Sequence, residues 1–82
     1  MDVVKLKVSD NQQKFFRSLP LHHSQKEIET KDDYSVFEYY IQPTFDFRQT
    51  ILSFADSVEV LEPQWLRNEI AEKVKKMAAM YP

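Results

Sequence analysis

Apolar and charged residues alternate at the start of the chain. In the run VVKLKV, from Val3 to Val8, Lys5 and Lys7 each stand between apolar neighbours. This period of two places the apolar side chains on one face of a β-strand and both lysines on the other. The sequence therefore predicts a half-buried first strand.

The next segment has the apolar spacing of a short helix. Phe15, Phe16 and Leu19 supply its apolar side, and a proline follows directly. Ser9 is expected to cap the first turn, with Gln12 three residues later completing a capping box.

Two strands of different character come next. The segment Gln25–Lys31 holds one apolar residue, Ile28, among charged neighbours, which suits the edge of a sheet. The segment Val36–Gln42 (VFEYYIQ) is rich in aromatic and β-branched residues and predicts a central strand. The residues of this strand expected to face the core are Phe37, Tyr39 and Ile41.

The second half of the chain predicts a helix, a short strand and a long helix. Thr44 or Asp46 is expected to cap the first of these helices. The short strand spans Val58–Leu61. Pro63 suits the first position of the last helix, which is expected to run to Tyr81.

Both helices carry an apolar face. The buried side of the first is expected to contain Phe47, Ile51, Leu52 and Ala55. The last helix repeats apolar residues at steps of four, four, three and four, at Leu66, Ile70, Val74, Met77 and Tyr81. Leu52 and Ile70 lie in the middle of these faces and are expected to be core residues. The pairs Glu69–Lys73 and Glu72–Lys76 are spaced to interact along the last helix.

The order of elements predicts an α+β fold. A ferredoxin-like β-α-β-β-α-β sandwich with an extra C-terminal helix fits this order, with the antiparallel sheet in the order 4-1-3-2. The charged second strand then lies at an edge, and the first and third strands lie in the centre. Helices cover one face of the sheet and leave the other open. We expect a single domain over residues 1–82.

Composition narrows the classes of function. The chain has a net charge of −2 and a pI near 5.6, whereas DNA-binding domains are usually basic. It has no cysteine, which excludes disulfides and thiolate chemistry. No apolar run approaches the roughly 20 residues that span a membrane, so a cytoplasmic protein without a membrane partner is expected.

The chain lacks the residue patterns of the enzymes that share this order of elements. An acylphosphatase needs a phosphate-binding loop after the first strand, but Val8–Gln12 contains no arginine and the chain no glycine. His22 and His23 are adjacent in a predicted loop, which is not the spacing of a metal site. No enzyme activity and no cofactor are therefore expected.

The run ILSFADSVEVLEPQWL, from Ile51 to Leu66, resembles the tail of WYL-domain transcriptional regulators. In that family a helix, a turn and a VxVLxP strand precede a closing helix that ends in tyrosine. The segment RSLPLHHSQ, from Arg17 to Gln25, resembles the entry to the same C-terminal extension. One departure is that the family usually has a glycine in the turn after the LSF helix, where this chain has Ala55-Asp56-Ser57. Alanine has a steric cost at positive φ that glycine does not.

This resemblance implies a non-catalytic regulatory and dimerisation domain. The parent protein would carry a winged-helix DNA-binding domain and a ligand-sensing barrel upstream, and this extension would couple sensing to DNA binding. It implies a homodimer formed through the parent protein, with DNA bound only by the missing N-terminal part. Trp65-Leu66 is not the Trp-Tyr-Leu signature that names the family, because that signature lies in the separate barrel domain.

Two other classes of function remain open. One is an ACT-like domain that senses small molecules at a seam between subunits. The other is a single-stranded nucleic-acid-binding module that uses the open face of the sheet. A genomic sequence upstream of Met1 that encodes a barrel with a Trp-Tyr-Leu run favours the regulator over both.

Two groups of residues are candidates for contacts with partners. The candidate partner or dimer surface comprises the open sheet face and the last helix, with Lys5, Lys7, Glu38, Tyr40, Met77 and Tyr81. The candidate contact to an effector or a neighbouring domain comprises Arg17, His22 and His23.

Overall fold

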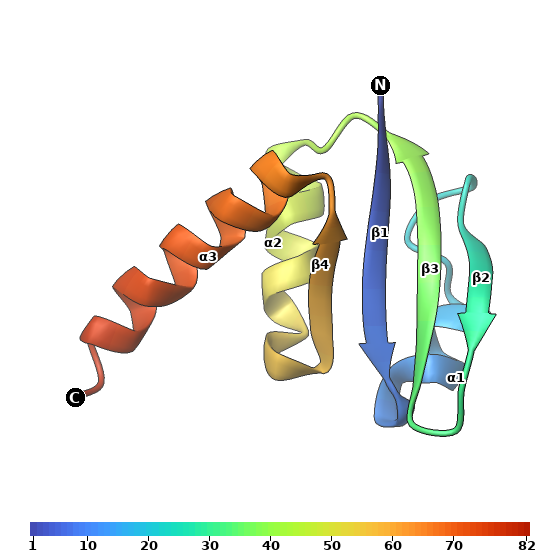
Figure 1. Ribbon diagram of the computed structural model, residues 1–82, viewed down its shortest axis with the longest axis horizontal. Helices are drawn as coiled ribbons and strands as arrows, with labels where there is room; N and C mark the ends of the chain where they lie inside the picture. The colour runs from blue at the N-terminus through green and yellow to red at the C-terminus, as the bar shows by residue number, and fades with distance from the viewer.

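One antiparallel sheet of four strands, in the order β2-β3-β1-β4, forms the centre of the molecule (Figure 1). The computed structural model describes residues Met1–Pro82. The elements are β1 (Asp2–Ser9), α1 (Asp10–Ser18), β2 (Lys26–Thr30), β3 (Tyr34–Ile41), α2 (Phe45–Ser53), a 3₁₀ turn (Ala55–Ser57), β4 (Val58–Glu62) and α3 (Gln64–Ala79). This is the predicted strand order read from the opposite edge, and the predicted order of elements is confirmed. None of the helices is long and apolar enough to cross a membrane.

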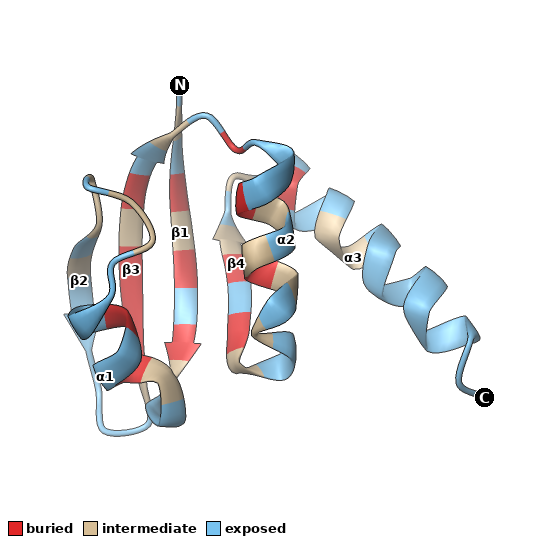
Figure 2. Ribbon diagram, turned by 180° about the vertical axis from the view of Figure 1, so that it is seen from behind, coloured by how far each residue is buried: buried red, intermediate tan, exposed pale blue.

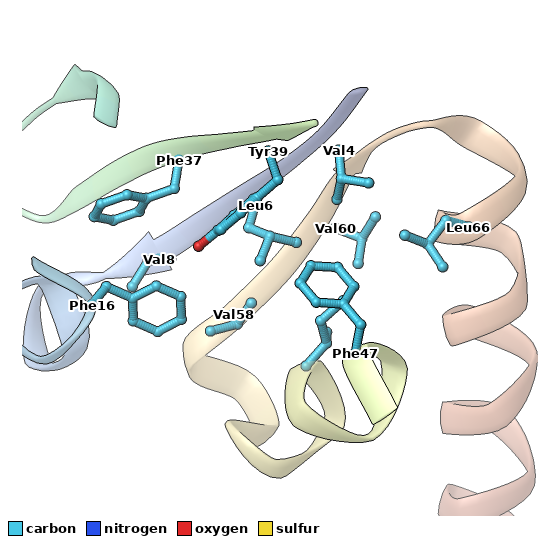
Figure 3. Close-up of a cluster of buried hydrophobic side chains, with 11 residues drawn as sticks. Val4, Leu6, Val8, Phe16, Phe37, Tyr39, Phe47, Val58, Val60 and Leu66 are labelled. Atoms are coloured by element: carbon cyan, nitrogen blue, oxygen red, sulfur yellow. The ribbon is translucent and has the colours of Figure 1, made fainter. Parts of the chain in front are cut away.

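Strand register places the apolar residues of three strands on one face. Leu6 of β1 lies opposite Phe37 of β3 on one side and Val60 of β4 on the other. Helices α1 and α2 cover this face (Figure 2). The resulting core consists of Val4, Leu6, Val8, Phe16, Phe37, Tyr39, Phe47, Ile51, Val58, Val60 and Leu66 (Figure 3).

Helix α1 contributes fewer core residues than its sequence predicted. Phe16 is fully buried and stacks near Phe37, with 5.4 Å between the ring centroids. Phe15 and Leu19 are largely exposed, because the helix is only nine residues long and turns one narrow side to the sheet. The predicted capping box is wrong: the Ser9 hydroxyl donates to the Asn11 side chain instead of capping the helix.

Helix α2 begins as predicted and ends earlier than its apolar pattern suggests. The Thr44 hydroxyl accepts a hydrogen bond from the backbone N–H of Phe47 at 3.3 Å, so Thr44 is the cap. Leu52 is half-buried rather than a core residue, because it points toward α3 and not toward the sheet. Ala55 lies beyond the helix and is exposed, so its predicted place on the buried side is wrong.

Ala55 has a backbone φ of 54°, so the turn in which related sequences usually hold a glycine has its positive φ at the first of its three residues. Helix α2 ends at Ser53 with Phe54 as its C-cap, and Ala55 is the first residue of the 3₁₀ turn. A Cβ at positive φ crowds the neighbouring carbonyl, which costs roughly 1–2 kcal/mol. The turn therefore keeps its geometry although the favoured residue is missing.

Helix α3 contacts the body near its first turns and then leads away from the edge of β4 (Figure 1). Pro63 is the residue that caps the helix rather than its first residue. Leu66 is the buried residue of the helix, Ile70 is half-buried, and Val74 and Met77 are about half exposed. The helix ends at Ala79, so the predicted extension of the helix and of its apolar stripe, the row from Leu66 to Met77, as far as Tyr81 is wrong. No part of this chain covers the second half of this stripe.

Truncation of neighbouring residues on α2 should separate core from surface. Ile51 is 2% exposed and packs in the core, whereas Leu52 faces α3. We expect Ile51→Ala to lower the free energy of unfolding by about 2–5 kcal/mol. Leu52→Ala should cost clearly less, because it creates no closed cavity. Urea unfolding measures both, and equal losses would contradict this assignment of faces.

Ala55→Gly should stabilise the fold by about 0.5–1 kcal/mol, because glycine adopts positive φ without the clash. The gain is smaller than the relieved strain, since glycine is also freer in the unfolded chain. The matched control is Ala78→Gly in the exposed part of α3, which should be destabilising or neutral. A destabilising Ala55→Gly in thermal or urea melts would show that the turn is unstrained.

Candidate functional site

A wedge between α3 and the body is the largest apolar hollow of the molecule. This hollow, called the wedge below, has a volume of about 680 Å³ and is bounded by α2, β4 and α3. Its walls are formed by Ile51, Leu52, Ala55, Asp56, Val58, Glu59, Val60, Arg67, Ile70, Ala71, Val74, Lys75 and Met77. Because β4 is an edge strand, the wedge also lies against an unpaired strand edge.

Two arginines hold the first turns of α3 against the body. Arg67 Nη1 donates to Glu59 Oε2 at 2.6 Å and to the backbone carbonyl of Val60 at 2.8 Å. Arg48 of α2 forms an ion pair with Glu69 at 3.0 Å, with Nε too far off line for a hydrogen bond. The expected pairs within α3 do not form; Glu72 lies instead near Lys75, at 3.7 Å. The angle of α3 is thus set near its start.

A second hollow of about 600 Å³ lies on the other side of α3. Its apolar lining consists of Phe45, Leu52, Trp65 and Ile70, of which Phe45 is the most exposed. Glu69, Glu72 and Lys73 give it a charged rim. Trp65, in the first turn of α3, therefore lies at the surface rather than in the core. Helix α3 borders a different hollow on each of two sides.

The sheet face opposite α1 and α2 carries four of the predicted surface residues. Lys5 lies opposite Glu38 in the register of β1 and β3, and it forms an ion pair with Glu62 at 3.4 Å. Lys7 Nζ lies 4.6 Å from the ring centroid of Tyr34, a cation–π distance. Tyr40 is 59% exposed. The structure brings Lys5, Lys7, Glu38 and Tyr40 together on this face and places Met77 and Tyr81 far from them on and after α3.

Phe37 and Tyr39 do not line the open face. Both are buried in the core, as the alternation of β3 predicted. The Tyr39 hydroxyl donates to Gln25 Oε1 at 2.6 Å, and burial raises the pKa of Tyr39. These two rings are therefore not accessible for stacking on nucleic-acid bases.

Gln25 is a residue whose role the sequence pattern missed. Its Nε2 donates to the backbone carbonyl of Phe16 at 2.8 Å, and its Oε1 accepts from the N–H of Leu21 at 3.1 Å. Together with the bond from Tyr39, these contacts fix the loop between α1 and β2. A single glutamine at the end of a loop has no periodic pattern that would predict these contacts. The only indication in the sequence was its position in the RSLPLHHSQ segment that resembles the family.

Arg17 is exposed on the surface and is held there by an ion pair with Glu27. It donates to both carboxylate oxygens of Glu27, at 2.8 and 2.7 Å. Glu27 Oε2 also accepts from the hydroxyls of Ser35 at 2.6 Å and Thr30 at 2.7 Å. Hydrogen bonds from Arg17, and then from Ser35 and Thr30, lower the pKa of Glu27 to about 2. The Glu27 carboxylate likewise raises the pKa of Arg17.

His22 and His23 stack on each other in the same loop, with 4.1 Å between ring centroids. His22 Nδ1 lies 2.7 Å from the Ser24 hydroxyl, which accepts from the N–H of Tyr40 at 3.0 Å. The loop is thereby attached to β3 at the end of the open face. No three His, Cys, Asp or Glu side chains gather as a metal site in the chain. Of the predicted contact group, the two histidines stay together, and Arg17 belongs to the Glu27 network.

The Glu27 network should make stability depend on pH. A carboxylate whose folded pKa is depressed contributes stability above its unfolded pKa, near 4.5, and loses it as the pH falls toward about 2. We expect the free energy of unfolding of the wild type to fall over this window and that of Glu27→Gln to fall less. Glu29→Gln is the matched control, since this neighbour is exposed on the same strand. Equal pH slopes for wild type and Glu27→Gln in urea melts would contradict the assignment.

Comparison with known families places this architecture. The family model described as the WCX domain matches residues 2–78, which is nearly the whole chain. The match includes the Arg17–Gln25 loop, the Ala55 turn and all but the last residue of α3. A search of curated proteins finds no match. The chain belongs to the WCX domain family, the C-terminal domain found in WYL-domain regulators.

Proposed function

We propose that this chain is a non-catalytic regulatory and dimerisation domain of a bacterial WYL-type transcriptional regulator. It would couple effector sensing by other parts of the protein to DNA binding by its N-terminal part. The WCX match over residues 2–78 is the observation that carries this proposal. The arrangement of strands and helices supports a ferredoxin-like sandwich with an added helix for this domain.

The surfaces of the chain suit contacts with protein better than catalysis. The wedge is apolar and open at one end, and α3 exposes Val74 and Met77 beside it. Exposed apolar surface of this kind marks protein–protein contacts in soluble domains. The open sheet face adds a polar surface around Tyr40, which suits a wetter contact with a neighbouring domain.

Charge supports a division of labour within the proposed regulator. The chain has a net charge of −2, and the lysines of the open face already interact with Glu62 and Tyr34. Neutralisation of phosphates by Lys and Arg supplies most of the affinity of non-specific DNA binding. DNA contacts are therefore assigned to the winged-helix part of a cytoplasmic regulator, and this domain to assembly and signalling.

The role in signalling is tested on the complete regulator. Its effector-dependent DNA binding is measured with and without the segment that corresponds to residues 2–78. We expect the variant without the segment to lose the response to effector. A shortened regulator that dimerises and responds like the full one would overturn the proposal.

The isolated chain should not bind duplex DNA in a sequence-dependent way. Its net charge of −2 is unlike the basic surface with which DNA-binding domains contact a phosphate backbone. A gel shift at physiological salt with the operator of the parent regulator and a scrambled duplex measures this, with the full regulator as positive control. Submicromolar, operator-specific binding by the chain alone would contradict the prediction.

A further inference from the structure

We propose that Arg67 of α3 is an edge guard, a side chain that keeps the outer edge of β4 closed to the addition of another β-strand. An edge strand presents unpaired N–H and C=O groups, which are a template for pairing with a second chain. The guard acts within one chain, so it is independent of the regulatory role proposed above.

The two edges of the sheet differ in how their sequences protect them. At one edge, β2 carries Lys26, Glu27 and Glu29 within five residues, and such a density of charge disfavours strand addition. At the other edge, β4 has the sequence VEVLE, which is mainly valine and leucine and contains neither lysine nor proline. The protection of β4 therefore has to come from another element.

The contact with Arg67 shows which backbone groups of β4 point outward. In an antiparallel sheet the backbone groups of successive residues point alternately to the two sides of a strand. The Val60 carbonyl accepts a hydrogen bond from Arg67 Nη1 at 2.8 Å, and α3 lies on the side of β4 away from β1 (Figure 1). Val60 and Val58 therefore face the outer edge, and Glu59, between them, faces its partner Lys7 in β1.

The regular part of this edge is short. The register with β1 moves from Val60 to Glu62 in one step, so Leu61 is the extra residue of a bulge that interrupts pairing. Val58 follows directly on the 3₁₀ turn. Val58 and Val60 are thus the outward-facing residues in regular strand geometry. Occupation of the Val60 carbonyl leaves Val58 alone, and one residue does not support a ladder.

A carboxylate holds the guanidinium in this place. Arg67 Nη1 also donates to Glu59 Oε2 at 2.6 Å, and hydrogen bonds between charged groups are stronger than those between neutral groups. A competing strand would have to displace Arg67 from both acceptors and leave the Glu59 carboxylate without its partner. The other arginine contact of the helix, between Arg48 and Glu69, joins α3 to α2 and not to β4.

Sedimentation velocity on the full chain over a concentration series tests the guard. Arg67→Met keeps a long, helix-compatible side chain that cannot donate a hydrogen bond. We expect larger species of this variant to appear at a concentration at least about tenfold lower than for the wild type. Arg67→Lys, whose ammonium can still donate to the carbonyl and the carboxylate, should stay within about twofold of the wild type.

Arg48→Met is the matched control. It removes an arginine contact of the same helix but leaves the edge of β4 occupied. It should also stay within about twofold of the wild type. Circular dichroism shows whether each variant is folded. If Arg67→Met is not folded, Arg67→Gln, whose shorter side chain does not span both acceptors, takes its place in the same comparison.

Hydrogen exchange by NMR identifies the edge that pairs. The outward N–H of Val60 is unpaired in the single chain and should exchange faster than that of Glu59, which faces β1. When a strand adds to β4, the Val60 N–H becomes hydrogen-bonded. We expect its exchange in Arg67→Met to slow at least about tenfold from low to high concentration, and to remain unchanged in Arg48→Met.

Three results would overturn the guard. The first is a folded Arg67→Met that assembles no more readily than the wild type. The second is assembly of Arg67→Met without slower exchange at Val60, which would place the contact away from the edge of β4. The third is equal assembly of Arg48→Met, which would assign the effect to a loosened α3.

Discussion

The apolar face of β1 is the feature on which the rest of the structure depends. Val4, Leu6 and Val8 are all fully buried, and β1 pairs with β3 on one side and β4 on the other. Both helices that cover the sheet pack onto this face, so its alternation fixes which side of every neighbouring strand is apolar. A shift of one residue in the register of β1 would turn the whole face to solvent.

Polar contacts then connect the elements at one end of the molecule. Glu27 ties α1 to β2 and β3 through Arg17 and Ser35, and Gln25 ties Tyr39 to the loop that precedes β2. The attachment of α3 is different, because it consists of the buried Leu66, the half-buried Ile70 and two arginine contacts in the first half of the helix. The chain therefore combines a firmly held sheet with a helix whose far half is free to bind another surface.

This division fits the proposed role in a regulator. A firm sheet can transmit a displacement from a neighbouring domain, and an uncovered helix can join two copies. The loop with His22 and His23 lies where the open face ends, attached to Tyr40 through Ser24. A domain that contacts the open face would therefore touch the same loop, which links the two groups of residues that were predicted separately.

The sequence by itself determined the elements, their order and the identity of the centre and edges of the sheet. Alternation in β1 and β3 and the charged composition of β2 are local signals, and local backbone preference together with burial decides them. The same signals predicted Phe37 and Tyr39 as core residues and left Thr44 and Asp46 as two candidates for the cap of α2. The family resemblance identified the turn at Ala55-Asp56-Ser57 as a place where a glycine is usual, and the structure showed that Ala55 is the residue with positive φ.

Only the tertiary structure decided what covers each apolar face. The spacing of apolar residues on α3 predicts that one side of the helix is apolar, but it does not predict the angle between the helix and β4. That angle follows from Arg67 meeting Glu59 and Arg48 meeting Glu69, contacts between elements that no spacing reveals. For the same reason, the sequence did not predict the ion pair of Arg17 with Glu27 or the orientation of Leu52 toward α3. Periodicity fixes which side of an element is apolar, and packing between elements fixes where that side ends up.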